Sequence, residues 1–266
     1  MHAFDYHAPT TIEAAIAQLQ QSDEAQLLAG GMTLLPTLKQ RLAAPSDLVD
    51  LSAIAALHGI DASADAIRVG AMATHASVAQ SALVREHLPA LAELAHGIGD
   101  AQVRHRGTLG GSIANNDPAA DYPAALVALQ AVVHTDRREI SAADFFSGMF
   151  ETALADDELI TAVVFPKCIT AAYAKFPNPA SGYAMAGVFV ARLGGQVRVG
   201  VTGAAACVYR ESTLEQRLTA RFEGIALDDV EVSTEDFNED LHADAAYRGQ
   251  LVRVMAARAV DQARSR

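Results

Sequence analysis

The chain has 266 residues, 51% of them hydrophobic, which is enough apolar material for the core of one large or two small domains. Its 20 Lys and Arg residues against 32 Asp and Glu residues give a net charge of −12, which excludes the broad basic surface that a nucleic-acid partner requires. The two cysteines, Cys168 and Cys207, cannot form a disulfide framework, and no segment resembles an export signal or a membrane span, so we expect a cytoplasmic protein.

The first part of the chain predicts a helix, a strand, a glycine turn and a second helix. Apolar residues recur at helical spacing over residues 12–19, behind a capping-box pattern. The short apolar run 26–29 is typical of a strand, and it leads into Gly30-Gly31. Thr33 then stands where it can cap a helix through about Leu42.

The middle of the chain alternates short strands with helices. Thr74 can cap a helix that continues to roughly Arg85 and stops before Pro89. The glycine-rich segment 106–112 runs into the polar residues 113–118, and together they indicate an unusually long polar loop. The other predicted elements are strands at 49–51, 67–70 and 158–165, a hairpin over 132–140, and helices at 91–96 and 121–129.

The last third of the chain predicts an antiparallel sheet with helices. Residues 187–193 and 196–203 flank Gly194-Gly195, the two-residue glycine turn of a tight hairpin. Helical spacing marks residues 214–222 and 247–255, and the acidic stretch 235–240 between them is typical of a solvated surface.

Self-contained catalytic motifs are absent from the sequence. It has no G-x-S-x-G elbow, no H-E-x-x-H pair and no G-x-x-x-x-G-K-[ST] phosphate loop, which argues against ordinary hydrolases and kinases. The nine histidines are scattered without the spacing of metal ligands. We therefore predict no metal on this chain and no catalytic residue of its own.

Two glycine segments, Ala29–Thr33 and Thr108–Ser112, are the remaining candidates for a binding site. Each could present consecutive backbone N–H groups, and the first does so at the start of a helix. Such nests bind anions without lysine, so the pair could hold a diphosphate even in an acidic protein. Taken singly, each segment could equally be a simple connection.

The residues around these segments resemble one family, the FAD-binding medium subunits of molybdenum hydroxylases. The resemblance is carried by residues 27–36 and 102–121, and residues 158–166, 173–176 and 247–248 extend it along the whole chain. The family includes the flavoprotein subunit of aerobic carbon monoxide dehydrogenase and the FAD domain of xanthine dehydrogenase.

The resemblance implies an α+β fold, a two-subdomain FAD-binding fold of the vanillyl-alcohol-oxidase type followed by an antiparallel sheet with helices. The FAD-binding domain would cover residues 1–170, with subdomains at about 1–55 and 56–170, and the C-terminal domain would cover residues 171–266.

The resemblance also implies the residues that contact FAD. The two glycine segments would wrap the diphosphate, Asp121 would lie beside the flavin or its ribityl chain, and could also cap the helix that follows it. Lys175 would stand near the pyrimidine edge and raise the flavin potential, and Tyr183 would cover the ring. The predicted cofactor-binding residues are Leu28, Ala29, Gly30, Gly31, Met32, Thr33, Leu34, Thr108, Leu109, Gly110, Gly111, Ser112, Asp121, Ile160, Lys175 and Tyr183.

In function, the resemblance implies the electron-output subunit of a molybdenum hydroxylase. Electrons would arrive from iron–sulfur clusters, which need about four cysteines and so belong on a partner, because this chain has two. The expected assembly is a heterotrimer with a large molybdopterin subunit and a small iron–sulfur subunit, or a dimer of heterotrimers. Two alternatives stay open: a free-standing FAD oxidase of the vanillyl-alcohol-oxidase type, and a non-catalytic nucleotide-binding protein. The sequence names neither the substrate nor the acceptor, which could be NAD, a quinone or oxygen.

Overall fold

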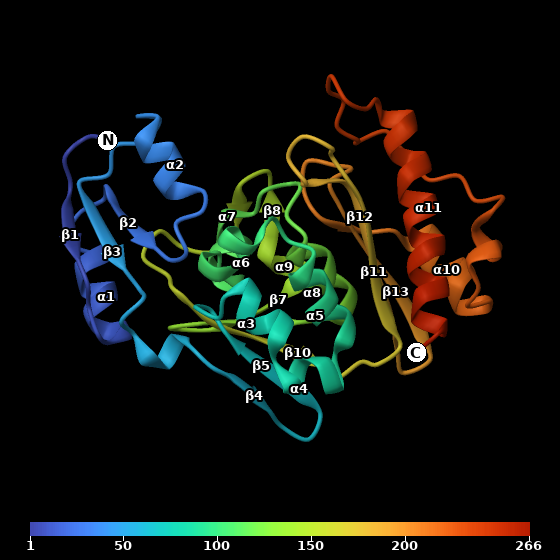
Figure 1. Ribbon diagram of the computed structural model, residues 1–266, viewed down its shortest axis with the longest axis horizontal. Coiled ribbons are helices and arrows are strands. Elements are labelled where there is room, and N and C mark those ends of the chain that lie inside the picture. Colours follow the sequence, from blue (N-terminus) through green and yellow to red (C-terminus); the bar gives the residue numbers. More distant parts are fainter.

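The computed structural model describes residues 1–266 as three units arranged along the long axis of the molecule (Figure 1). A three-stranded sheet forms the N-terminal unit, a five-stranded sheet the central unit and a four-stranded sheet the C-terminal unit. No helix in the structure combines the length and apolarity that crossing a membrane would require.

The N-terminal unit is a small parallel sheet in the order β1-β3-β2, covered by two helices. Thr11 caps the first helix by accepting a hydrogen bond from the Ala14 N–H at 3.2 Å. The second helix ends at Lys39, earlier than predicted, and Arg41 just beyond it has a left-handed φ of 60°. The elements are β1 (Asp5–His7), α1 (Ile12–Leu19), β2 (Ala25–Leu28), α2 (Leu34–Lys39) and β3 (Asp47–Asp50).

The central unit is an antiparallel sheet in the order β4-β5-β10-β6-β7, with β10 in its middle. A register shift between Ile160 and Ala162 marks the start of β10. Its strands are β4 (Ile60–Ala62), β5 (Ala66–Gly70), β6 (Val132–Thr135), β7 (Glu139–Ser141) and β10 (Ile160–Pro166), with the small pair β8 (Phe146–Gly148) and β9 (Glu151–Thr152) beside them. Its helices are α3 (His75–Gln80), α4 (Ala82–His87), α5 (Pro89–His96), α6 (Ala101–Arg106), α7 (Leu109–Asn115), α8 (Tyr122–Leu129) and α9 (Ala142–Phe145), with the short η1 (Ala55–Leu57).

Two predictions for this unit were wrong. The single helix expected after Thr74 is two helices, because Ser81 has an extended backbone and its side chain caps α4. The expected polar loop contains helix α7, which begins directly after Thr108. Its two glycines lower helix propensity and so concealed the helix. Glycine is nevertheless required at position 110, because a Cβ there would lie 2.7 Å from the Ala71 Cβ.

The C-terminal unit packs a long helix, α11, against an antiparallel sheet in the order β11-β12-β13-β14 (Figure 1). The predicted hairpin is confirmed, and its turn residues Gly194 and Gly195 have positive φ values of 56° and 85°. The elements are β11 (Ala171–Pro177), β12 (Ala184–Leu193), β13 (Gln196–Thr202), β14 (Tyr209–Arg210), α10 (Ser212–Ala220), η2 (Gly224–Leu227) and α11 (Ala245–Arg264).

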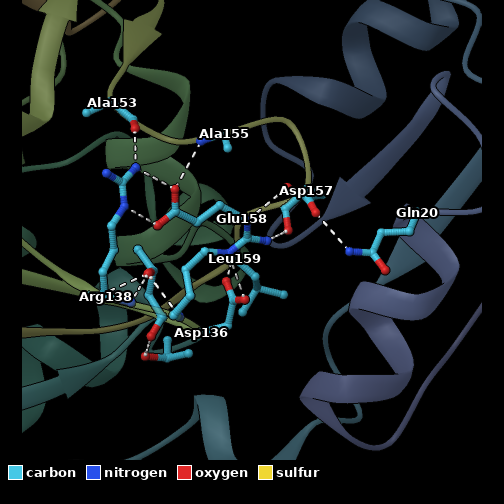
Figure 2. Close-up of polar contacts among 11 residues, drawn as sticks. Gln20, Asp136, Arg138, Ala153, Ala155, Asp157, Glu158 and Leu159 are labelled. Carbon is cyan, nitrogen blue, oxygen red and sulfur yellow. Dashed lines mark hydrogen bonds and ion pairs between the residues drawn. The ribbon is translucent and has the colours of Figure 1, made fainter.

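A polar network fixes the loop that leads into β10 (Figure 2). The Arg138 guanidinium donates to both carboxylate oxygens of Glu158, at 2.8 and 2.7 Å, and thereby lowers the Glu158 pKa from 4.5 to about 2. The side chain of Gln20, the residue that follows α1, donates to Asp157 at 2.8 Å. The network therefore connects the N-terminal unit to the strand that begins at Ile160.

Candidate functional site

The first glycine segment leaves a run of backbone donors free. It joins the end of β2 to the start of α2, and none of the six N–H groups from Ala29 to Leu34 donates to another protein group. Gly30 and Gly31 are buried, and Gly31 has a left-handed φ of 72°. A turn of this kind makes successive N–H groups converge on an anion, so the segment fits the nest that the sequence predicted.

The second glycine segment differs from this expectation. The N–H groups of Leu109 and Gly110 donate to the carbonyls of Ala73 and Ala71, at 3.0 and 2.8 Å. The Gly111 N–H donates to the Thr108 hydroxyl oxygen at 3.1 Å, which caps α7.

Free donors in this segment are therefore few. The Ser112 N–H donates to the Thr108 carbonyl at 3.0 Å, so the Thr108 N–H is the one backbone donor without a protein acceptor. The hydroxyls of Thr108 and Ser112 donate to no protein group. This segment offers a ligand side-chain hydroxyls and the start of a helix rather than a row of free amides.

The fold brings the two segments into contact although they lie about 80 residues apart. A Cβ on Gly30 would overlap the Arg106 carbonyl oxygen and would lie 2.8 Å from the Gly107 Cα. A Cβ on Gly111 would lie 3.3 Å from the Ala29 Cβ. Glycine at both positions therefore allows the first segment to lie directly against the second.

Asp121 lies at the start of α8, but its side chain makes no capping hydrogen bond. The expectation that Asp121 caps this helix is therefore wrong. Its carboxylate instead accepts from the Tyr173 hydroxyl at 2.5 Å and pairs with the Lys175 Nζ at 3.0 Å. Burial raises the Asp121 pKa, and the charge of Lys175 and the Tyr173 hydrogen bond oppose the rise. Lys175 is itself only 13% exposed in its side chain, and it also donates to the Gly97 carbonyl at 3.0 Å.

Tyr183 lies in the turn before β12, where the residue is 49% exposed. It borders a cleft of about 400 Å³ that Pro118 and Asn178 also line. Burial and the negative charges of Asp117 and Asp121 raise the Tyr183 pKa.

Ile160 is buried at the start of β10 and is linked to the second segment through the backbone. The Thr161 carbonyl accepts from the Ala71 N–H at 3.0 Å, and the Ala71 carbonyl accepts from the Gly110 N–H at 2.8 Å. Leu28, at the end of β2, is buried, whereas Met32 and Thr33 are exposed on the other side of the glycine pair and Leu34 is half-buried. The predicted residues thus fall into a glycine group and a group around Asp121.

Two neighbours of the site were missed by the sequence analysis, Tyr173 and His75. His75 is buried under the second segment, where a Cβ on Gly107 would lie 2.5 Å from its Nε2, and its Nδ1 has no partner. Burial and the charge of Arg104 lower the His75 pKa from 6.5 to about 4. A histidine at the start of a helix gives no spacing signal, whereas Tyr173 could have been found two residues before Lys175 on one strand face.

Comparison with known proteins identifies the family. A family model described as the FAD binding domain in molybdopterin dehydrogenase matches residues 2–168. The chain belongs to this family. Its α+β fold and FAD as its cofactor, both expected from the sequence, are thereby confirmed.

Individual relatives match over the full length of the chain. The sequence is 34% identical to the nicotine 6-hydroxylase medium subunit of Paenarthrobacter nicotinovorans, over 99% of this chain and 98% of that protein. It is equally similar, 34% with the same coverage, to the carbon monoxide dehydrogenase medium chain of Hydrogenophaga pseudoflava. The structure is also similar to that of quinoline 2-oxidoreductase from Pseudomonas putida 86, with a TM-score of 0.89 at 28% identity over 99% of this chain and 97% of that one.

Proposed function

We propose that this protein is the FAD-carrying electron-transfer subunit of a molybdenum hydroxylase. It would accept electrons from iron–sulfur clusters of a partner and pass them to an external acceptor. The observation that carries the proposal is the match to medium subunits over 99% of this chain and 98% of theirs. The matched relatives are medium subunits, which favours this function over that of a free-standing oxidase.

The free amides of Ala29–Leu34 would hold the FAD diphosphate, with the start of α7 on its other side. Neutral N–H donors and the hydroxyls of Thr33, Thr108 and Ser112 suit a chain whose net charge is −12, because they bind phosphate without a lysine. Leu28, Met32 and Leu34 would supply apolar contacts beside the diphosphate, whereas the Leu109 side chain is fully buried in the core and would support the start of α7.

Asp121, Lys175 and Tyr183 would together orient the isoalloxazine ring, which supplies the redox chemistry when bound. Lys175 would lie at the pyrimidine edge, Tyr183 would cover one face of the ring, and Ile160 would close the site from β10. Because Lys175 is paired with Asp121 at 3.0 Å, its charge is already partly balanced by the protein. This chain therefore binds and orients the cofactor and excludes water, and no residue of its own needs to transfer a proton.

The partners would be a large molybdopterin subunit and a small iron–sulfur subunit, in a heterotrimer or a dimer of heterotrimers. The presence of only two cysteines supports a cluster-free chain, and both are free, which suits the reducing cytoplasm. The substrate would be chosen by the large subunit.

We further propose a domain boundary near residue 170, between β10 and β11. The C-terminal sheet nevertheless shares part of the central core, because Phe189 and Ala191 of β12 pack in the same buried cluster as Val163 of β10. We therefore expect the two domains to unfold together rather than separately.

Purification of the native complex tests the proposal. We expect FAD on this chain, and molybdenum and iron on separate large and small chains at equal stoichiometry. A colourless chain that does not take up added FAD would refute the proposal, and so would turnover of an organic substrate by the isolated chain.

A further inference from the structure

Tyr173 makes the shortest contact to the buried Asp121 carboxylate. Tyr173 and Lys175 are two residues apart on β11, so both side chains stand on one face of the sheet. The phenol donates to Asp121 Oδ1 at 2.5 Å, and the Lys175 Nζ lies 3.0 Å from the same oxygen. Two donors from one strand thus converge on one carboxylate at the residue that precedes α8.

The fold makes a specific place for this phenol. Tyr173 pairs with Phe189 across the strands, and their rings stack with centroids 6.3 Å apart. Its hydroxyl lies over Gly187, where any Cβ would overlap it. The hydroxyl therefore has a fixed position and one acceptor, Asp121. A tyrosine that only filled space in the core would need neither the acceptor nor the glycine opposite its hydroxyl.

The hydroxyl acts on a carboxylate with few other charges around it. Tyr173 and Lys175 of β11 contact the Asp121 carboxylate. Burial and the negative charge of Asp121 raise the pKa of Tyr122 in α8 and of Tyr183 in the turn before β12. Lys175 is the one cation among these groups. Burial raises the Asp121 pKa, while the charge and hydrogen bond of Lys175 and the hydrogen bond of Tyr173 lower it. Without the phenol, the carboxyl would take up a proton more readily and would leave Lys175 with an unbalanced positive charge.

We propose that Tyr173 is a positioning residue that keeps Asp121 ionised and in contact with Lys175, and so limits the positive charge that Lys175 presents to the flavin. The inference rests on the proposed function, which places Lys175 beside the ring. A positive charge near the pyrimidine edge favours the reduced, anionic ring and raises its potential. Tyr173 would therefore hold the flavin potential down.

The test is a redox titration of the FAD-loaded complex carrying Tyr173→Phe. The titration is monitored through flavin absorbance and is repeated at several pH values between pH 6 and pH 9. We expect unchanged FAD content and a midpoint potential above that of the wild type, with the difference growing as the pH falls. Asp121→Asn mimics the protonated carboxyl, so it should raise the potential at every pH, and adding Tyr173→Phe to it should change nothing further.

Tyr6→Phe is the matched control, because the Tyr6 hydroxyl donates to Asp50 at 2.6 Å on an exposed part of the N-terminal sheet. It should leave the potential unchanged. A Tyr173→Phe potential equal to the wild type at all pH values would overturn the inference, even if the variant unfolded at a lower temperature. Normal flavin content in the same samples would show that the proposed function survives. A colourless wild type would instead remove the proposed function and this inference with it.

Discussion

The two glycine segments have similar sequences, but their backbone groups are used differently. In the first, the N–H groups from Ala29 to Leu34 have no protein acceptor, whereas in the second the amides of Leu109 and Gly110 are hydrogen-bonded to the turn after β5. We therefore propose the first segment as the binding surface and the second mainly as a support that adds hydroxyls and a helix start. Glycines in a sequence show where backbones approach closely, but not which backbone donors remain free.

Gly30→Val should have the largest effect, because it separates the two segments. Its Cβ would overlap the Arg106 carbonyl, which is backbone and cannot yield as a side chain would. We expect complete loss of FAD and destabilisation by about 1–3 kcal/mol, measured by flavin absorbance and denaturant unfolding. Gly148→Ala is the control, since its Cβ would closely approach only the Glu151 side chain. Retention of FAD by Gly30→Val would mean that the contact between the segments does not matter.

Gly111→Glu should abolish FAD retention with a smaller loss of stability. The new side chain would begin 2.9 Å from the Thr108 Oγ1 and 3.3 Å from the Ala29 Cβ, and it would place a carboxylate where the diphosphate is proposed to lie. The new Cβ would also crowd the Thr108 hydroxyl that caps α7, so we expect part of the stability loss to come from a weakened cap. Gly111→Gln separates charge from size and should retain more FAD. Equal flavin content in the wild type and Gly111→Glu would contradict the proposed site.

Thr108→Val and Thr33→Val should separate support from binding. Thr108 caps α7, so its loss should cost about 1 kcal/mol of stability in addition to weaker FAD binding. Thr33 makes no capping bond, so its loss should change stability by less than about 0.5 kcal/mol. Urea unfolding of both variants without FAD, followed by FAD titration, measures the two effects. Similar stability losses in the two would remove the distinction.

The Glu158 network should affect stability in acid and leave FAD binding at neutral pH unchanged. The Glu158 pKa is lowered in the folded chain to about 2 from 4.5, so its contribution is present above about pH 4.5 and is lost as the pH falls toward 2. Glu158→Gln should flatten this part of the stability profile of the FAD-free chain, measured by thermal unfolding between pH 3 and pH 7. An unchanged acid profile would show that the ion pair contributes nothing.

Local patterns predicted the parts of the fold that depend on local chemistry. Gly194-Gly195 gave the hairpin, and the apolar run 26–29 followed by Gly30-Gly31 gave the strand and turn of the first segment. Helix α7 was missed because its glycines are required by neighbours distant in sequence, Ala71 beside Gly110 and Ala29 beside Gly111, and no local pattern contains these contacts.

The surroundings of Asp121 could not be predicted for a similar reason. At the start of a helix, an aspartate is ordinarily a cap, and nothing nearby in sequence indicates a lysine and a tyrosine that come from 54 and 52 residues further along. Only the packing of β11 against the central unit brings these groups together, and Gly187 on the next strand makes room for the phenol.

Amide hydrogen exchange with and without FAD tests the central claim most directly. The free amides of Ala29–Leu34 should exchange rapidly in the FAD-free chain and become protected when FAD binds, whereas those of Leu109 and Gly110 should be protected in both states. Equally rapid exchange of residues 29–34 in a chain that holds one FAD would contradict the claim.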